Sequence, residues 1–267
     1  MLVLDAQFRC AGALALHNSA TKFNSFACLV ETSLYTYFHI NRTTASWLLT
    51  KLKNYDAHVP NIYGAPKVHK PNCPLRPIVN NRASPTYALA KWLAQQLKIN
   101  QNFNENEIVN SYEFKEDIID MKLNGNQRII SLDVESMFTS IPIPTIMDAL
   151  NHVIKESKIN NLLKSEFLIG IEFCLKTTYF IYDDQIYLQM KSATMGSPIS
   201  PNTACITIGQ LEIKALNSLK NDVYYFKRYM DDSILFINQG SEQNILDTFN
   251  NLLPDINYSM EVDNKNQ

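Results

Sequence analysis

The sequence has 267 residues, of which 46% are hydrophobic, and its formal net charge at pH 7 is −2. This length suits one large domain or two small ones, and the apolar content is sufficient for a buried core. No stretch approaches about eighteen uninterrupted apolar residues, and Asp5 and Arg9 interrupt the N-terminal apolar run, so neither a membrane partner nor a secretory signal is predicted.

The cysteines and the charge distribution narrow the class of protein further. The five cysteines include no Cys-x-x-Cys pair, which favours reduced thiols in an intracellular protein, nuclear or cytoplasmic, over a zinc site. Residues 57–104 contain no acidic residue but six basic ones, so the remainder of the chain sums to −8. A basic segment beside an acidic remainder fits a polyanion held near a metal site, with a solvated basic surface as the alternative. The six basic residues are Lys67, Lys70, Arg76, Arg82, Lys91 and Lys98.

The first part of the chain shows no recognisable chemistry. Residues 1–56 are predicted to form a helical extension, with helical apolar spacing over 45–52. Residues 61–79 contain four prolines and a glycine, which exclude a helix and indicate short extended pieces joined by turns. Ser84-Pro85 then resembles an N-cap followed by proline, so a helix is expected over 84–99.

The middle of the chain alternates strand and helix signals. A helix is expected near 112–123, a turn at 124–126, and a strand over 128–134 that carries Asp133 near its end. A carboxylate on an otherwise buried strand needs a partner or a metal. Helices follow from within 141–144 to about 157, over 165–176 and over 200–220, with a hairpin over 179–190 that turns at Asp183-Asp184.

A second acidic hairpin is predicted near the C-terminus. Aromatic and β-branched residues flank Asp231-Asp232, which places the pair at a turn between two strands. Two fixed carboxylates repel each other unless a cation lies between them, and oxygen ligands of this kind suit Mg²⁺. An ordinary acidic turn, like that at Asp183-Asp184, is the alternative. A helix over 242–252 and a strand over 256–262 follow.

These segments together resemble a reverse transcriptase. Residues 229–232 (Tyr-Met-Asp-Asp) resemble the YxDD turn of the family, Asp133 resembles its first catalytic aspartate, and residues 195–201 resemble its QGxxxSP element. The amino-acid sequences of residues 63–71 and 131–142 are similar to those of Penelope-like retroelement reverse transcriptases.

The resemblance implies a right-hand polymerase fold of the α+β class, with fingers and an antiparallel palm sheet backed by helices. Residues 57–127 are then expected to be a fingers-like segment, and 128–267 the palm with finger insertions. The chain ends before the LPFLD element that continues the family pattern, so the thumb is expected to be missing.

The implied reaction is two-metal transfer of a nucleotide to a primer 3′-hydroxyl. The implied partners are an RNA template, a DNA primer, deoxynucleoside triphosphates and two Mg²⁺ ions, with Mn²⁺ as a possible substitute. The implied metal ligands are Asp133, Asp231, Asp232 and the main-chain carbonyl of Val134.

The resemblance also implies roles around the metals. Lys67 and Arg76 would neutralise the β- and γ-phosphates, and Gly196 would lie where backbone approaches the nascent base pair. The expected primer and template contacts are Tyr229, Met230, Lys70, Ser200 and Pro201.

Phe138 bears on the sugar of the incoming nucleotide. At the matching family position an aromatic ring lies where a 2′-hydroxyl would point and offers it no hydrogen bond, which costs about 1–3 kcal/mol. A DNA product is therefore expected, although core packing is the commoner role of a phenylalanine. The alternatives are an inactive, polymerase-derived nucleic-acid-binding remnant and an RNA-dependent RNA polymerase.

Overall fold

The computed structural model describes residues 13–16, 57–68, 70–100, 106–157, 159 and 161–263. The chain forms two compact units that alternate along the sequence. Unit 1 comprises Met1–Gln101 and Ile141–Ala204, and unit 2 comprises Asn102–Ser140 and Cys205–Gln267.

The boundary between the units differs from the one predicted at 127/128, and the assignment of 57–127 to fingers and of 128–267 to a palm with finger insertions stays a prediction. Residues 106–127 belong to unit 2 because they pack with the sheet of that unit, whereas 141–204 belong to unit 1. Of the predicted N-terminal helical extension, the described stretch is a strand, β1 (Ala13–Leu16), and the remainder of 1–56 lies outside the described residues.

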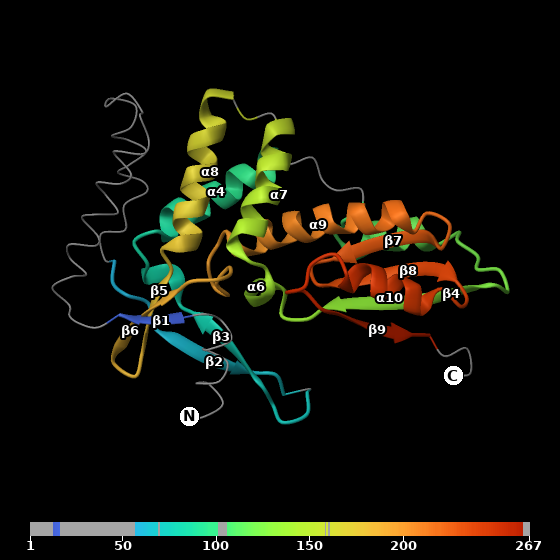
Figure 1. Ribbon diagram of the computed structural model, residues 1–267, viewed down its shortest axis with the longest axis horizontal. Helices are drawn as coiled ribbons and strands as arrows, with labels where there is room; N and C mark the ends of the chain where they lie inside the picture. The colour runs from blue at the N-terminus through green and yellow to red at the C-terminus, as the bar shows by residue number, and fades with distance from the viewer. Residues whose placement is uncertain are drawn as a thin grey trace. The chain divides into compact units, whose positions relative to one another are not determined.

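Unit 1 contains two small antiparallel sheets (Figure 1). One has the strand order β1-β6-β5, with β5 at Tyr179–Tyr182 and β6 at Gln185–Gln189. The other is the hairpin of β2 (Ile62–Pro66) and β3 (Leu75–Val79). Val79 and Phe180 are buried together, so the two sheets share an apolar cluster.

The helices of unit 1 supply the rest of its core. They are α4 (Tyr87–Asn100), α7 (Ile143–Glu156) and α8 (Asn161–Lys176), preceded by the 3-10 turn η1 (Asn81–Ala83). Helix α8 packs against both α4 and α7. The α4–α8 contact includes an edge-to-face pair of Trp92 and Phe167 with ring centroids 6.2 Å apart. Helix α9 (Ser200–Ser218) begins in unit 1, and the unit boundary falls within it.

Unit 2 is built on one four-stranded antiparallel sheet of order β7-β8-β4-β9. The strands are β4 (Gln127–Val134), β7 (Val223–Tyr229), β8 (Asp232–Asn238) and β9 (Tyr258–Val262). Alternation along these strands directs Ile130, Leu132 and Leu235 into the core. The opposite face carries Asp133 and Asp232, which are register partners.

Helices cover one face of this sheet. In α10 (Glu242–Asn250), Phe249 stacks on Phe226 of β7 at 6.1 Å and meets Tyr258 of β9 edge-to-face at 5.1 Å. The C-terminal part of α9 contacts β7 through the buried pair of Glu212 and Arg228. The short helices α5 (Ser111–Ile118) and α6 (Met137–Ser140) complete the unit.

Most of the predicted helices and strands are confirmed, but some of them begin at residues other than those predicted. Helix α4 begins at Tyr87 because Ser84 accepts the N–H of Thr86 in a preceding turn rather than capping the helix directly. Helix α8 begins at Asn161, four residues before the predicted cap at Ser165. The four-residue α6 was not predicted. In the described part of the chain no helix is long and apolar enough to span a bilayer.

Candidate functional site

Two carboxylates face each other across adjacent strands of unit 2. Asp133 of β4 and Asp232 of β8 are register partners at the end of the β4–β8 ladder. Residues directly opposite in an antiparallel pair have Cβ atoms about 4.5–5.5 Å apart. The sheet register therefore holds two of the three predicted aspartates side by side.

The third carboxylate lies on the two-residue loop between β7 and β8. Tyr229 pairs with Asp232, which leaves Met230 and Asp231 as the loop. Met230 has φ 57°, and a positive φ at the first loop residue alone is the φ pattern of a type II′ turn, where glycine is usual. A side chain in a sparsely populated backbone region costs on the order of 1–3 kcal/mol, so the surroundings must hold it there.

The surroundings of this loop capture both of its peptide carbonyls. The N–H of Val134 donates to the Asp231 carbonyl at 3.1 Å, which ties the loop to β4. On the other side, Nη1 of Arg228 donates to the Met230 carbonyl at 2.8 Å. Asp231 thus projects from a loop in which both peptide carbonyls accept hydrogen bonds, and Asp232 follows it as the first residue of β8.

The electrostatics of the loop reflect this crowding of acids. Burial raises the pKa of Asp232, and the negative charges of Asp231, Asp133 and Glu261 raise it further. A neighbouring cation would reverse these effects by stabilising the carboxylate form.

The donor set fits a hard divalent cation. All three aspartates offer carboxylate oxygen, which is the ligand chemistry of Mg²⁺ and Mn²⁺. Among the described residues no group of three or more His, Cys, Asp or Glu side chains is placed so that it could hold a metal ion by itself. Mg²⁺ is usually bound by one or two carboxylates with water and substrate phosphates, so a complete protein cage is not required.

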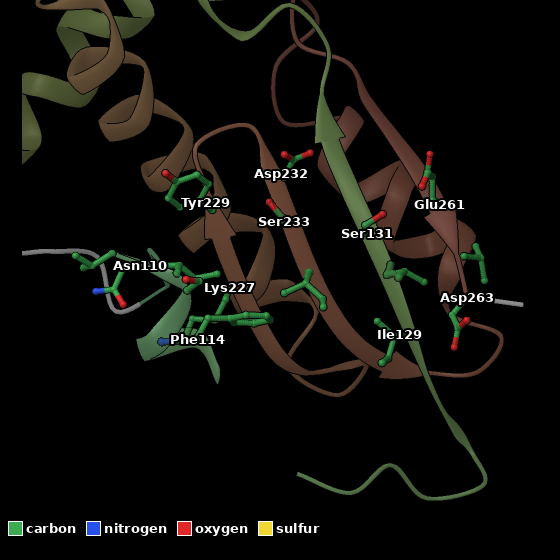
Figure 2. Close-up of a pocket in the computed structure, with 16 residues that line it drawn as sticks. Asn110, Phe114, Ile129, Ser131, Lys227, Tyr229, Asp232, Ser233, Glu261 and Asp263 are labelled. Atoms are coloured by element: carbon green, nitrogen blue, oxygen red, sulfur yellow. The ribbon is translucent and has the colours of Figure 1, made fainter. Parts of the chain in front are cut away.

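A hollow of about 990 Å³ lies over the Asp232 face of this sheet, beside α5. Figure 2 shows Asp232 and Tyr229 at one end of the strands, with Ser131 and Glu261 on the neighbouring strands. Lys227, within the hollow, forms an ion pair with Asp117 of α5 at 3.0 Å. Ile129 and Ile234 give the hollow apolar lining, and its acidic lining residues are Asp232, Glu261 and Asp263.

The predicted residues next to the aspartates also belong to unit 2. Tyr229 is 56% and Met230 36% exposed, so both apolar side chains are accessible at the loop. Phe138 is half-buried on α6, which follows the end of β4 after a turn in which Ser136 has φ 54°. Val134 is buried, and its main chain adjoins the loop through the bond to Asp231.

The predicted phosphate ligands belong to unit 1. Arg76 is half-buried on β3 opposite Ala65, and Lys67 and Lys70 lie in the turn between β2 and β3. That turn is closed by hydrogen bonds from Lys67 N to Pro74 O at 2.8 Å and from Cys73 N to Lys70 O at 3.1 Å. These cations are therefore carried by one ordered hairpin.

Gly196 has a structural requirement of its own. Its φ is 110°, and a Cβ built there would lie 2.1 Å from the carbonyl oxygen of Val79. The adjacent Met195 carbonyl accepts the N–H of Val79 at 2.9 Å. Close approach to β3 thus accounts for the glycine without any ligand, whereas the sequence analysis assigned it to a nascent base pair.

Ser200 and Pro201 begin α9, as predicted. Their burial bears on the expectation that they contact primer or template. The Ser200 side chain is 1% exposed, so it packs inside unit 1 rather than facing nucleic acid, and Pro201 is half-buried. The second acidic pair, Asp183-Asp184, is an ordinary turn. Both residues have positive φ, as a type I′ hairpin loop requires, and Asp tolerates that conformation.

Sequence analysis did not identify Arg228 and Glu212, which lie beneath the acidic loop. Their side chains are 1% and 0% exposed, and Arg228 Nε donates to Glu212 Oε2 at 2.9 Å, while Oε1 lies 2.7 Å from the same nitrogen outside hydrogen-bond geometry. Burial raises the pKa of Glu212, and the guanidinium beside it opposes that rise. Arg228 lies two residues after Phe226, so the period of a strand places both on the same, buried face of β7. This spacing is the sequence signal that could have revealed a buried arginine.

Comparison with known proteins identifies the family. The family described as reverse transcriptase (RNA-dependent DNA polymerase) matches residues 68–264, which include the acidic loop and both of its flanking strands. The chain belongs to the reverse transcriptase family. A search of curated protein sequences finds no match.

Solved structures with a similar fold include polymerases of two kinds. Apo telomerase from Candida tropicalis matches with a TM-score of 0.57 at 12% identity, over 79% of this chain and 45% of that one. Candida albicans telomerase in complex with a fragment of telomeric RNA matches at 0.53 and 13%, over 84% and 47%. The RNA-dependent RNA polymerase of BmCPV matches at 0.54 and 10%, over 77% and 20%. The chain spans less than half the length of each of these, and at such identities the likeness shows the fold, a mixed α+β polymerase fold with an antiparallel sheet backed by helices.

Proposed function

We propose that this chain carries the polymerising centre of an RNA-directed DNA polymerase from a retroelement of the Penelope-like type. The observation that supports the proposal is that Asp133, Asp231 and Asp232 lie next to one another at one end of the unit 2 sheet, in a member of the reverse transcriptase family. The amino-acid sequences of residues 63–71 and 131–142 support the Penelope-like assignment.

In this proposal the three aspartates hold Mg²⁺ or Mn²⁺, with the main-chain carbonyl of Val134 as a further oxygen ligand. When bound, such cations lower the pKa of a primer 3′-hydroxyl and stabilise charge on the transferred phosphate. The substrates are deoxynucleoside triphosphates, a DNA primer and an RNA template.

The other residues act on substrate position and selectivity. Phe138 excludes a 2′-hydroxyl, and Lys67 and Arg76 neutralise the triphosphate. Tyr229 and Met230, which are exposed on the loop, contact the primer terminus through their apolar surfaces. Lys70 contributes a phosphate contact from the exposed hairpin turn.

Primer extension on an RNA template tests the proposal. We expect Mg²⁺- or Mn²⁺-dependent extension with deoxynucleotides, and a loss of about two to three orders of magnitude in Asp231→Asn, because metal ligation supplies several kcal/mol of transition-state stabilisation. Asp183→Asn is the matched control, since it changes the other Asp-Asp hairpin loop and leaves extension unchanged.

The remaining functions are separate outcomes of the same assay. Preferential incorporation of ribonucleotides would identify an RNA-dependent RNA polymerase. Binding of a primed template without extension by any nucleotide would identify an inactive nucleic-acid-binding remnant. Unchanged extension in Asp231→Asn would contradict the assignment of the site.

A further inference from the structure

We infer that the buried ion pair of Arg228 and Glu212 is a positioning device that sets the geometry of the acidic loop, an inference that rests on the proposed function of that loop. Both side chains are buried, so neither is exposed to contact a substrate. Its action is through the Met230 carbonyl, one residue before Asp231.

The guanidinium connects the loop to helix α9. From one rigid plane, Nη1 donates to the Met230 carbonyl at 2.8 Å, Nη2 to the Cys205 carbonyl at 3.2 Å and Nε to Glu212 Oε2 at 2.9 Å. Cys205 and Glu212 are both on α9, so a single side chain spans from the loop to two points along that helix. A planar fork of donors can hold three acceptors at fixed angles, which a lysine ammonium on a flexible stem cannot.

The main chain of Arg228 is fixed as well. Its N–H donates to the Asn106 carbonyl at 2.7 Å, and its carbonyl accepts the N–H of Ile108 at 2.8 Å, so residues 106–108 pair along the outer edge of β7. The side chain therefore extends from an anchored backbone. Movement of the Met230 carbonyl would break a hydrogen bond whose donor cannot follow.

The loop needs this support for two reasons. Met230 has a positive φ without being glycine, so the loop does not favour its observed conformation on its own. The three carboxylates also repel each other, which favours spreading of the loop. The Arg228 bond opposes both tendencies from the side opposite to the Val134–Asp231 bond.

A buried ion pair is a poor choice for stability alone. Replacing both partners by apolar side chains of similar size is commonly neutral or stabilising, whereas removing one leaves a buried charge without a partner. The double variant Arg228→Met/Glu212→Met consequently separates the two roles. We expect it to keep the melting temperature within a few degrees of wild type while it loses the bond to Met230.

Amide hydrogen exchange of Val134 is the decisive measurement, because that N–H donates to Asp231 and reports loop geometry without metal or substrate. We expect exchange at Val134 to accelerate at least tenfold in the double variant. The N–H of Asn238, which donates to Asp222 at 2.9 Å at the far end of the sheet, is the internal control and should change little. Wild-type exchange at Val134 in the folded double variant would overturn the inference.

Arg228→Lys provides a second test if the double variant does not fold. Lysine keeps the charge opposite Glu212 but cannot also reach the Met230 and Cys205 carbonyls, so the same tenfold acceleration at Val134 is expected. Unchanged exchange in this variant would also overturn the inference.

Mn²⁺ binding, followed by electron paramagnetic resonance, tests whether the Arg228–Glu212 pair affects metal binding at the acidic loop. We expect affinity to fall at least tenfold in Arg228→Met/Glu212→Met and to be abolished in Asp231→Asn. If wild type binds no Mn²⁺, the proposed function fails, while the exchange of Val134 still decides the role of Arg228. If the double variant binds Mn²⁺ as wild type does, the positioning role is excluded.

Discussion

Asp133 and Asp232 are register partners across β4 and β8, although almost a hundred residues separate them in the chain. Pairing of the two strands is enough to bring their carboxylates together, and the Val134–Asp231 hydrogen bond adds the third carboxylate. Three acidic groups at one sheet end destabilise each other in the absence of a cation. In the proposed function, a bound cation would offset this repulsion.

Titration of Asp232 tests this relationship directly. Burial and the nearby charges of Asp231 and Asp133 raise its pKa above the ordinary value of 3.8. We expect carboxyl carbon resonances to show a midpoint above that value, to shift down in Asp231→Asn, and to stay unchanged in Asp183→Asn. Added Mg²⁺ should also lower the midpoint, because it favours the ionised form. An ordinary or lowered midpoint in wild type would contradict the crowding of charges.

The sign of the pH dependence follows from the same shift. An acid whose pKa is raised by folding contributes stability that is fully present below its unfolded-state pKa and is lost as pH rises through the folded-state pKa. Cation binding depends on pH in the opposite sense, since it needs the carboxylate. Affinity for Mn²⁺ should therefore weaken as pH falls, beginning above the range in which an ordinary aspartate titrates.

Selection against ribonucleotides is the test of Phe138. If its ring excludes a 2′-hydroxyl, Phe138→Val should lower the ratio of kcat/KM for deoxy- over ribonucleotide by about ten- to a hundredfold, equivalent to 1–3 kcal/mol. Phe173→Val, which shortens another half-buried phenylalanine on α8, is the matched control and should not change the ratio. Equal effects of the two substitutions would assign Phe138 to core packing.

The sequence was sufficient to predict most of the elements that form the site. Aromatic and β-branched residues predicted β7 and β8, a strand was predicted at β4, and the acidic pair between β7 and β8 predicted the turn. The positions of Asp231 and Asp232 follow from such local patterns. The pairing of β4 with β8 does not, because sheet order depends on contacts between distant segments. The family resemblance implied only that Asp133 lies with Asp231 and Asp232 as metal ligands.

What sequence analysis missed lies in the packing between elements. Glu212 shares α9 with the buried Ile208 and Leu211, and an acidic residue on an apolar helix face indicates a buried partner without naming it. Gly196 is the opposite case, a residue assigned to substrate contact that has a structural reason of its own. Its loop suggested a ligand, whereas the approach of the Val79 carbonyl alone excludes a side chain. The pattern of a motif therefore does not separate contacts to substrate from contacts within the protein.

Arg76 is the predicted triphosphate ligand that can be tested most cleanly. A charge-assisted hydrogen bond contributes about 1.5–3 kcal/mol, so Arg76→Gln should raise KM for the deoxynucleotide about ten- to a hundredfold. Lys91→Gln removes an exposed charge on α4 from the same basic segment and should leave KM unchanged. If both variants weaken template binding equally and leave KM for the nucleotide alone, the basic segment is a general polyanion surface and Arg76 has no specific role.

Three glycine substitutions separate backbone strain from steric exclusion. Gly196→Ala combines a positive φ with a Cβ 2.1 Å from the Val79 carbonyl oxygen, so we expect it to lower the free energy of unfolding by about 3 kcal/mol or more. Gly240 has φ 95° but no atom near its Cβ position, so Gly240→Ala should cost only about 1–2 kcal/mol. Gly125 has neither constraint, and Gly125→Ala should stay within about 0.5 kcal/mol. Urea denaturation followed by circular dichroism measures all three. If Gly196→Ala proves no worse than Gly240→Ala, the loop of residues 195–201 can move away from β3, and a role for Gly196 in contacting substrate would regain support.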